Sequence, residues 1–256
     1  MTNAKYEAWL NGEALSNISP EIYISSIKAT PPKATLKASE IANRPGQRLN
    51  SVRWKDATVT ISFVTRKIAG HDRQAIVQDV YAWAASGGTL EISDRPGQQL
   101  HVICTSPPYI TDTCDFTEPI TVVFQTTDKP FWEEKQVTTT TLTAGTSGSG
   151  TIFVPGNAGK ALVEVTATPA DSSANLSFTV GSTTITLTGC NATSSNPLTI
   201  TYDGNEIQSI KVGTTSVMDK RTGSDDLLAV CGASNTVSFT ASASTAVTYS
   251  VRGLWM

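Results

Sequence analysis

The clearest structural signal in this chain is the segment Val59-Thr60-Ile61-Ser62-Phe63-Val64, in which apolar and polar side chains alternate. A period of two places the apolar residues on one face of an extended strand, so the segment predicts a half-buried β-strand. Ile120-Thr121-Val122-Val123-Phe124-Gln125 follows the same pattern with one slip, and residues 90–92 and 100–104 add shorter strands. The first part of the chain therefore predicts a β-sheet.

One helix is predicted between these strands. Asp72 can cap its amino end, and Gly87-Gly88 can stop it because glycine adopts the backbone angles that end helices. The apolar residues between these points recur at helical spacing, namely Ile76, Val77, Val80, Tyr81 and Ala84, with Trp83 at the margin. We expect the helix to span residues 72–85 and to cover one face of the sheet.

Two segments share a turn sequence. Asn43-Arg44-Pro45-Gly46-Gln47-Arg48-Leu49 is echoed by Asp94-Arg95-Pro96-Gly97-Gln98-Gln99-Leu100. Proline presets the first central position of a type II turn, and glycine tolerates the positive φ of the second. Each segment therefore predicts a chain reversal before a strand. Because no longer repeat surrounds them, we interpret them as a reused turn rather than as a duplication.

The charged residues divide the chain into two parts. Residues 1–135 hold 14 of the 19 Lys and Arg and 15 of the 22 Asp and Glu, whereas Ser and Thr make up about a third of residues 136–256. We therefore expect two domains, 1–135 and 136–256, which the chain length also favours. Near the start of the second lies Gly145-Thr146-Ser147-Gly148-Ser149-Gly150, a composition that predicts a flexible linker or a long first loop.

The second part is rich in strand patterns and has no convincing helix. Alternating segments recur at 161–167, 176–180, 183–187, 198–202, 207–212, 236–240 and 247–255. Short strands at this spacing predict a β-sandwich or jelly roll whose outward side chains are Ser and Thr. The predicted fold class is therefore mainly β: a β domain with one helix, followed by a β-sandwich.

Composition excludes several classes of protein. With 39% hydrophobic and 16% charged residues, the chain has enough apolar side chains for packed cores, so disorder is not expected. A formal net charge of -3 gives no basic field for a phosphate backbone, so we expect no nucleic-acid partner. We expect no membrane contact and synthesis in a cytoplasm, because the N-terminus lacks a signal-peptide pattern and no segment has the roughly 18 apolar residues of a membrane span.

The cysteines and histidines predict no metal site. Cys104, Cys114, Cys190 and Cys231 are widely spaced and form no CxxC pattern. In a reducing compartment this predicts buried thiols, with disulfides as the open alternative. A zinc site needs convergent ligands, and only His71 and His101 are available to join the cysteines.

No pattern predicts catalysis. There is no GxSxG elbow for a nucleophilic serine. His71 directly precedes the expected helix cap, where a solvated or capping role is expected. His101 and Cys104 lie an odd number of residues apart on a predicted strand, so they would face opposite sides of the sheet and not form a dyad. Acidic residues gather in two places, which leaves glycoside hydrolysis and calcium binding as alternatives to loop solvation. They are Asp112, Asp115, Glu118, Glu133 and Glu134 in the first part, and Asp203, Glu206, Asp219, Asp225 and Asp226 in the second. We expect solvation, and hence no catalytic, cofactor-binding or metal-binding residue.

Three tryptophans have alternative roles. Trp132 closes the last strand of the first part after the Asp128-Lys129-Pro130 turn, and we expect it to anchor the domain boundary or a subunit contact. We expect Trp54 and Trp255 in the core, with an exposed platform for carbohydrate as the alternative.

The order of motifs in the first part resembles that of the distal tail proteins of long, flexible-tailed bacteriophages. The motifs are Arg44-Pro45-Gly46 with Arg48-Leu49, Arg53-Trp54, the 59–64 strand, the 72–85 helix with Trp83, the Gly87-Gly88-Thr89-Leu90 stop, and the 120–125 strand with Asp128-Lys129-Pro130-Phe131-Trp132. The ordered set covers about residues 1–135, and the second part resembles the family only in its architecture.

The resemblance implies a first domain of split-barrel type that closes into a hexameric ring at the end of the tail tube, and a peripheral galectin-like β-sandwich. The implied partners are copies of itself, the tail tube protein, tail-tip proteins, and either a receptor-binding protein or cell-wall carbohydrate. The implied location is the tail tip of the virion. We expect residues 23–37 to form an extended arm that pairs with a sheet edge of a neighbouring copy.

A different class of function stays open from the residues alone. The Ser- and Thr-rich second part also suits a monomeric carbohydrate-binding module attached to an accessory β domain. The mass of the purified protein distinguishes this alternative from a ring.

Overall fold

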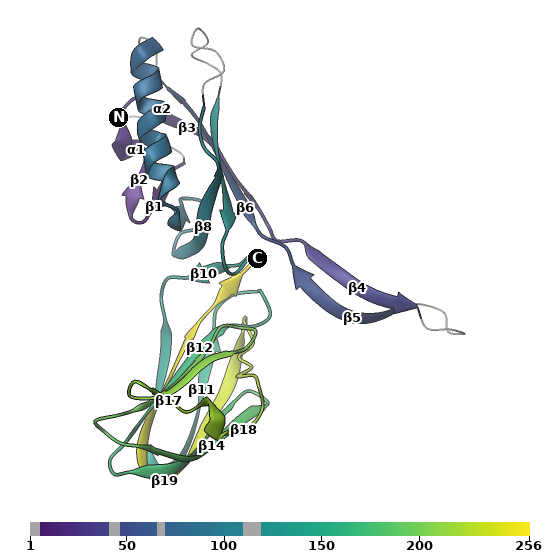
Figure 1. Cartoon of the computed structure of the whole chain (residues 1–256), viewed down its shortest axis with the longest axis vertical. Coiled ribbons are helices and arrows are strands. Elements are labelled where there is room, and N and C mark those ends of the chain that lie inside the picture. Colours follow the sequence, from purple (N-terminus) through teal and green to yellow (C-terminus); the bar gives the residue numbers. More distant parts are fainter. Residues whose placement is uncertain (1–5, 41–46, 66–69, 110–118) are drawn as a thin grey trace. The chain divides into compact units, whose positions relative to one another are not determined.

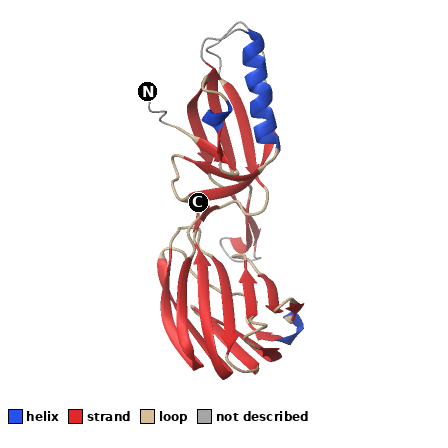
Figure 2. Cartoon of the chain, turned by 90° about the vertical axis from the view of Figure 1, so that its left-hand side faces the viewer, coloured by secondary structure: helices blue, strands red, loops and turns tan. Residues whose placement is uncertain are grey.

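The computed structural model describes residues 6–40, 47–65, 70–109 and 119–256 (Figure 1). The chain divides into two compact units, Met1–Trp132 together with Met256, and Glu133–Trp255. Both units consist mainly of antiparallel strands, which confirms the predicted mainly β fold class (Figure 2). Within the described ranges, no helix has the length and apolar character that crossing a membrane requires.

The first unit is built on an antiparallel sheet. Along its main path the strands are β2 (Glu13–Ala14), β1 (Ala8–Leu10), β7 (Gly88–Ile92), β8 (Gln98–Ser106), β9 (Ile120–Thr126), β6 (Thr58–Thr65) and β3 (Ile22–Thr30). Val59, Ile61 and Phe63 of β6 are buried, and the residues between them are half-buried, as the alternation predicted. This order places β2 and β3 at opposite edges of the sheet.

Helix α2 (Gly70–Ala85) covers one face of this sheet, as predicted (Figure 1). It starts two residues before the expected cap, so His71 lies in its first turn. The Trp83 ring is buried and contacts Phe124 of β9 edge-on, with ring centroids 5.9 Å apart. Gly87 ends the helix with a φ of 57°. A short helix that the sequence did not predict, α1 (Leu15–Ile18), packs against α2.

The second of the two predicted turns is observed. Gly97 has a φ of 79°, and the Gln98 amide donates to the Arg95 carbonyl at 3.2 Å, as a type II turn requires. The first copy of the turn sequence falls largely on residues 41–46, which lie outside the described residues.

A separate two-stranded sheet projects from the first unit. Strands β4 (Ala34–Glu40) and β5 (Gln47–Trp54) pair only with each other among the described residues, and they extend away from the main sheet (Figure 1). The predicted arm at 23–37 is therefore partly wrong. Residues up to Thr30 belong to β3, which pairs with β6, and the projecting part begins at Ala34.

The second unit contains strands only, apart from one 3-10 turn at Met218–Lys220. From the unit boundary onward the strands are β10 (Trp132–Glu134), β11 (Thr138–Val154), β12 (Leu162–Pro169), β13 (Ser173–Val180), β14 (Thr183–Ala192), β15 (Leu198–Tyr202), β16 (Ile207–Val212), β17 (Thr215–Ser216), β18 (Arg221–Gly223), β19 (Ala233–Arg252) and β20 (Leu254–Trp255). The separate strands predicted at 236–240 and 247–255 are mostly one continuous strand, β19.

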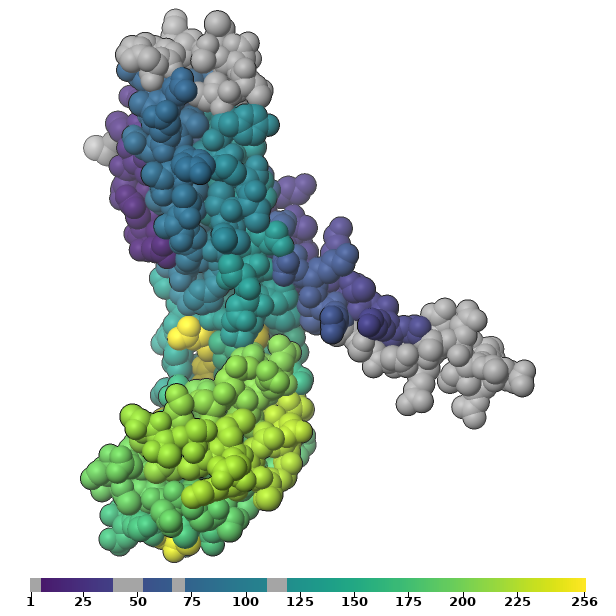
Figure 3. Space-filling model, in the orientation of Figure 1, coloured from purple at the N-terminus to yellow at the C-terminus, as the bar shows by residue number. Residues whose placement is uncertain are grey.

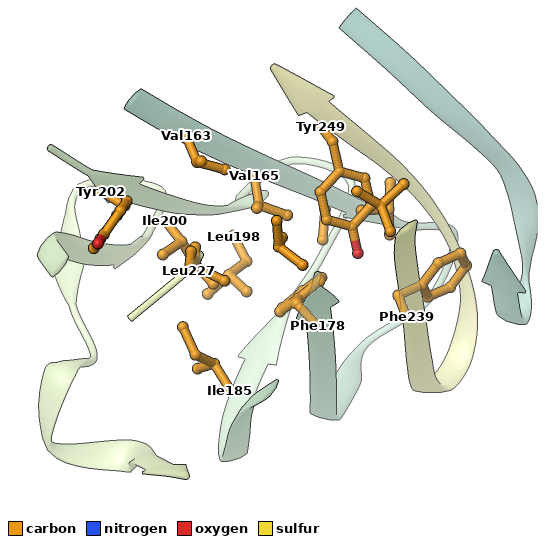
Figure 4. Close-up of a cluster of buried hydrophobic side chains, with 14 of the residues drawn as sticks. Val163, Val165, Phe178, Ile185, Leu198, Ile200, Tyr202, Leu227, Phe239 and Tyr249 are labelled. Atoms are coloured by element: carbon orange, nitrogen blue, oxygen red, sulfur yellow. The ribbon is translucent and has the colours of Figure 1, made fainter. Parts of the chain in front are cut away.

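Strand β19 belongs to both layers of the predicted β-sandwich. Its first half pairs with β13 and its second half pairs with β12. Strand β11 pairs with β19 along both halves. One layer therefore runs β17-β16-β15-β12-β19, and the other runs β19-β13-β14-β18. Apolar side chains from the two layers meet in a core that includes Val165, Ile200, Phe178 and Ile185 (Figure 4).

The Gly- and Ser-rich segment 145–150 is a strand, not the expected linker or loop. It lies within β11, paired with β19, and the register shifts around Gly145 allow the strand to bend between the two layers. A Cβ on Gly148 would lie 2.7 Å from the Phe239 ring, and one on Gly150 would lie 2.8 Å from Leu142. Glycine at these two positions allows the neighbouring side chains to pack closely on the strand. Composition alone does not show whether a glycine-rich segment is packed in this way or is flexible.

Candidate interaction surfaces

The first candidate surface is the described part of the projecting hairpin, here called the arm and defined as residues 33–38 and 53–55. Residues 33–38 and 53–55 are exposed, including the apolar side chains of Leu36 (62%) and Trp54 (42%). Its exposed charges are Lys33, Lys37, Arg53 and Lys55. Among the arm side chains that the structure describes, none is acidic, so the arm is a basic surface with two apolar side chains.

Two contacts fix the base of the arm. The Lys55 amide donates to the Lys33 carbonyl at 2.8 Å, and Trp54 packs edge-on against Phe131 with ring centroids 5.7 Å apart. The prediction that Trp54 is a core residue is wrong, because its strand belongs to the arm and not to the main sheet.

The second candidate surface, here called the helical surface, consists of the outward side of α2 and the neighbouring β1–β2 hairpin. The Trp83 indole donates to the Glu13 carbonyl at 3.2 Å, which holds this hairpin beside the helix. The outward residues of α2 include Ala75, Ala82 and Tyr81, whose side chain is 51% exposed. The exposed side of the helix is mixed, because these apolar residues alternate with the exposed Asp72, Gln74, Gln78 and Asp79.

The exposed charges of the helical surface are acidic. Glu13, Asp72 and Asp79 are exposed. Of the basic residues nearby that the structure describes, Arg73 is buried and Arg95 bonds Met256. The helical surface thus carries charge of the opposite sign to that of the arm.

Arg95, from the second turn sequence, binds the carbonyl of Met256. Two of its guanidinium N–H groups donate to this oxygen, each at 3.1 Å, and the guanidinium lies over the Trp132 ring at 5.2 Å from the centroid. Burial lowers the pKa of Arg95 from its ordinary value. Sequence reasoning identified this segment only as a turn, because nothing in its pattern indicates a partner 161 residues away.

Replacing Arg95 with alanine is expected to lower the free energy of unfolding of the first unit by about 2 kcal/mol, since charge-assisted hydrogen bonds and a cation–π contact are lost together. Urea denaturation followed by tryptophan fluorescence measures this change. Arg95→Lys keeps the charge but not the two-pronged donor geometry, so we expect an intermediate value. Equal stability of Arg95→Ala and the parent chain would contradict the role of this contact.

The second unit has a pocket of about 310 Å³ on β12, β15 and β19. Its polar lining includes Glu164, Thr201 and Arg252, and Val137 and Leu162 supply apolar walls. Tyr202 also lines this pocket, and its hydroxyl donates to Asp226 at 3.1 Å. Burial, with the negative charge of Asp226, raises the pKa of Tyr202, so this hydroxyl stays protonated at neutral pH.

A further pocket of about 320 Å³ lies on β13, β14 and β19, and its lining has no charged side chain. Hydroxyl groups of Ser177, Thr186, Thr240 and Ser242 line it beside Asn175. Trp255 lines neither of these two pockets; it is half-buried, and its indole donates to Glu134 at 3.0 Å. Among the residues that line the two pockets, Tyr202 of the first is aromatic, and it is almost fully buried.

The carboxylates considered for hydrolysis do not form an acid–base pair in the described residues. Glu133 is buried and pairs with Arg252 at 3.6 Å, and Glu134 accepts the Trp255 bond. Both therefore hold together the strands through which the chain enters and leaves the second unit. Asp112, Asp115 and Glu118 lie outside the described residues.

The acidic residues considered for calcium are dispersed. Asp203 accepts hydrogen bonds from the amides of Asn205 and Glu206, and Asp225 pairs with Arg221. In the part of the chain that the structure describes, no group of three His, Cys, Asp or Glu side chains converges. Cys104, Cys190 and Cys231 are free thiols; Cys190 is buried, and burial raises the pKa of the half-buried Cys104 and Cys231. His101 and Cys104 both lie on β8, and Cys114 lies outside the described residues.

Comparison with known proteins gives structural neighbours only. No protein-family model matches the chain, and no curated protein matches its sequence. The crystal structure of the Dit protein of phage SPP1, described as a paradigm of the hub adsorption apparatus in phages that infect Gram-positive bacteria, matches with a TM-score of 0.69. The match has 11% sequence identity and covers 96% of this chain and 98% of SPP1 Dit.

Two weaker neighbours come from structures of the phage P2 baseplate in its activated conformation. The structure with Ca matches at 9% identity and a TM-score of 0.44, covering 97% of both chains. The structure with Sr matches at 10% identity and a TM-score of 0.42, covering 96% of this chain and 97% of the other. Of these three matches, the SPP1 match has a score at which the fold is shared, and its coverage spans both units, so this chain has the fold of a phage distal tail protein.

Proposed function

We propose that this protein is the structural hub of a bacteriophage tail tip, where copies of it form a ring that joins the tail tube to the tip and receptor-binding proteins. The observation that carries the proposal is the likeness to SPP1 Dit over 96% of this chain and 98% of that one. Because both units match within one continuous chain, the likeness concerns the whole architecture and not one common β domain. The proposed location is the virion.

The two units have different roles in this proposal. The first unit forms the ring, which we propose to be a hexamer, and the second unit is a peripheral galectin-like sandwich. One feature of the first unit supports a ring: among the described residues the two strands of the arm pair only with each other, and they expose the apolar side chains of Leu36 and Trp54. The sandwich, with the two pockets described above, is the proposed contact for receptor-binding proteins or cell-wall carbohydrate.

We propose a mechanical role without catalysis. The contacts of Glu133 and Glu134 support it, because each carboxylate is engaged in holding strands together. A general acid for glycoside hydrolysis needs access to the substrate, and Glu133 is buried and ion-paired with Arg252.

Mass measurement tests the ring. Size-exclusion chromatography with light scattering is expected to give six times the 27.1 kDa of one chain at micromolar concentration. Negative-stain electron microscopy is then expected to show closed rings, since head-to-tail contacts close when the rotation between copies is a simple fraction of a turn. A mass of 27.1 kDa at every concentration would instead favour the monomeric carbohydrate-binding module.

A further inference from the structure

We infer that the uncharged pocket on β13, β14 and β19 binds a neutral saccharide, the chemistry of an uncharged stretch of cell-wall polysaccharide. The inference rests on the proposed role of the sandwich as a contact, which left both a receptor-binding protein and a carbohydrate open. It selects one of these ligands and one of the two pockets. It follows from the position of the pocket, its hydrogen-bonding groups and its lack of charge.

The pocket lies on the outer face of one layer of the sandwich. Phe178 of β13 and Phe239 of β19 point into the core (Figure 4). Because successive residues of a strand face opposite sides, their neighbours Ser177 and Thr240 face outward. All the lining residues belong to the second unit, the body coloured mostly green to yellow in Figure 3. The pocket is therefore a feature of the sandwich alone.

The pocket is located where β19 separates from β13. The pairing of these two strands ends at Leu176 and Ala241, and beyond this point β19 continues into the other layer, where it pairs with β12. The Asn175 amide donates to the Ser242 hydroxyl at 3.1 Å, which holds the two strands together at the separation. The resulting depression of about 320 Å³ has the size of a small ligand site, for which about 300 to 1,000 Å³ is usual.

The pocket offers hydrogen-bonding groups that no protein group uses. Within the described residues, the side-chain NH2 group of Asn175 and the hydroxyl of Thr240 have no partner, since the Asn175 side-chain oxygen is the atom that accepts from the Gly189 amide, at 3.3 Å. The hydroxyls of Ser177 and Thr186 bond each other at 3.1 Å, and each keeps the capacity for a further bond. Saccharide hydroxyls both donate and accept hydrogen bonds, so they match this set.

The strands around the pocket carry almost no charge. Strands β11, β13 and β14 contain no charged residue, and β19 contains only Arg252, its last residue. Lys220 approaches the region, but its ammonium group donates to the Gly189 carbonyl. A phosphate-bearing polymer is recognised through Arg and Lys side chains that pair with its charges. The pocket therefore favours an uncharged ligand over a polyanion.

The lining residues also favour a saccharide over a protein. Protein interfaces are enriched in aromatic residues, Met and Arg, and depleted in Ser and Ala. The pocket is lined only by Asn, Leu, Ser, Thr and Ala side chains, whereas the other pocket includes Arg252 and Glu164. Without an aromatic ring to stack on, one site binds weakly. Several copies in the proposed ring would compensate on a polymer that repeats the same sugar.

Saturation-transfer NMR on the full-length chain tests the inference. The neutral probes are D-glucose, D-galactose, N-acetyl-D-glucosamine and L-rhamnose, and the charged probe is sn-glycerol 3-phosphate. Each is added at about 10 mM, a concentration that nearly fills a site with a Kd of about 1 mM. We expect transfer to at least one neutral sugar and none to sn-glycerol 3-phosphate.

Two variants then locate the site. Thr240→Val keeps the shape of the side chain but removes its hydroxyl, and Asn175→Asp keeps an oxygen for the Gly189 amide but removes the NH2 donor. Each is expected to weaken binding of the sugar about 5-fold, the usual effect of losing one hydrogen bond. Thr236→Val is the matched control, because Thr236 is also exposed on the same face of β19 and lies outside the pocket. We expect it to bind the sugar as the parent chain does.

Each outcome has a definite meaning. Transfer to none of the neutral sugars, or to sn-glycerol 3-phosphate instead, overturns the inference and leaves a receptor-binding protein as the proposed contact of the sandwich. If a sugar binds but Thr240→Val and Asn175→Asp bind it as tightly as Thr236→Val does, the assigned pocket is wrong. The mass of the parent chain tests the hub separately: a monomer that binds sugar through this pocket contradicts the ring and not the pocket.

Discussion

Gly156→Ala is expected to destabilise the second unit by more than about 3 kcal/mol, because backbone strain and overpacking coincide at this residue. Gly156 has a φ of 112°, and a Cβ there would overlap the Leu254 carbonyl oxygen and lie 3.0 Å from the Leu254 nitrogen. These are backbone atoms, and the amides of Asn157 and Ala158 hold the same carbonyl at 2.9 and 3.1 Å. The chain therefore has little freedom to move away. Thermal denaturation followed by circular dichroism should show the transition of this unit about 10 °C lower.

Gly159→Ala is the matched control for this substitution. Gly159 also has a positive φ, 89°, but nothing lies within 4 Å of the place that a Cβ would occupy. We expect a cost of only about 1 to 2 kcal/mol, which is the strain of a left-handed conformation alone. Equal melting temperatures for the two variants would show that the close approach to Leu254 does not contribute.

Trp83→Ala is expected to lower the free energy of unfolding of the first unit by about 3 to 5 kcal/mol, the usual cost of removing a buried aromatic side chain. Its ring packs on Phe124 and its indole N–H bonds the Glu13 carbonyl. The substitution thus leaves a cavity between helix and sheet and deprives a carbonyl of its donor. Guanidinium denaturation of the full-length chain measures the loss, and a stability within 1 kcal/mol of the parent would contradict this role.

Two variants separate the contributions at Trp83. Trp83→Phe keeps an aromatic ring but removes the N–H donor, so about 1 to 2 kcal/mol of the loss should remain. Gln74→Ala, on the exposed side of the same helix, should change stability by less than about 0.5 kcal/mol, because surface substitutions rarely do more. If Gln74→Ala were as damaging as Trp83→Ala, helix propensity and not the buried contact would explain the loss.

Most of the strands could be predicted from the sequence, because their side chains alternate. The predicted strand at 59–64 is β6, and 198–202 and 207–212 coincide with β15 and β16. The helix was predictable for the same kind of reason, since its apolar spacing and its terminal glycines are local features. Fold class and the likeness to distal tail proteins followed from the order of these elements.

The candidate surfaces were harder to predict. Tyr81 was assigned to the buried side of α2 by its spacing, and Trp54 to a core, but both are exposed. Exposure depends on whether another layer covers the residue, and helical spacing does not report that. Lys33, Lys37, Arg53 and Lys55 were visible in the sequence, but only the structure shows that they are exposed on one projecting hairpin.

The amino-acid sequence by itself determined the periodicity of the elements, the two-part organisation and the mainly β class, because these depend on which side chains recur within about ten residues. Only the tertiary structure decided that residues 145–150 bend as a strand between two layers, that Arg95 bonds Met256, and that strands β4 and β5 form a sheet separate from the main sheet. Each of these depends on pairing between segments far apart in the chain. The packing of the whole unit selects this pairing, and a local sequence pattern does not report the free energy of that packing.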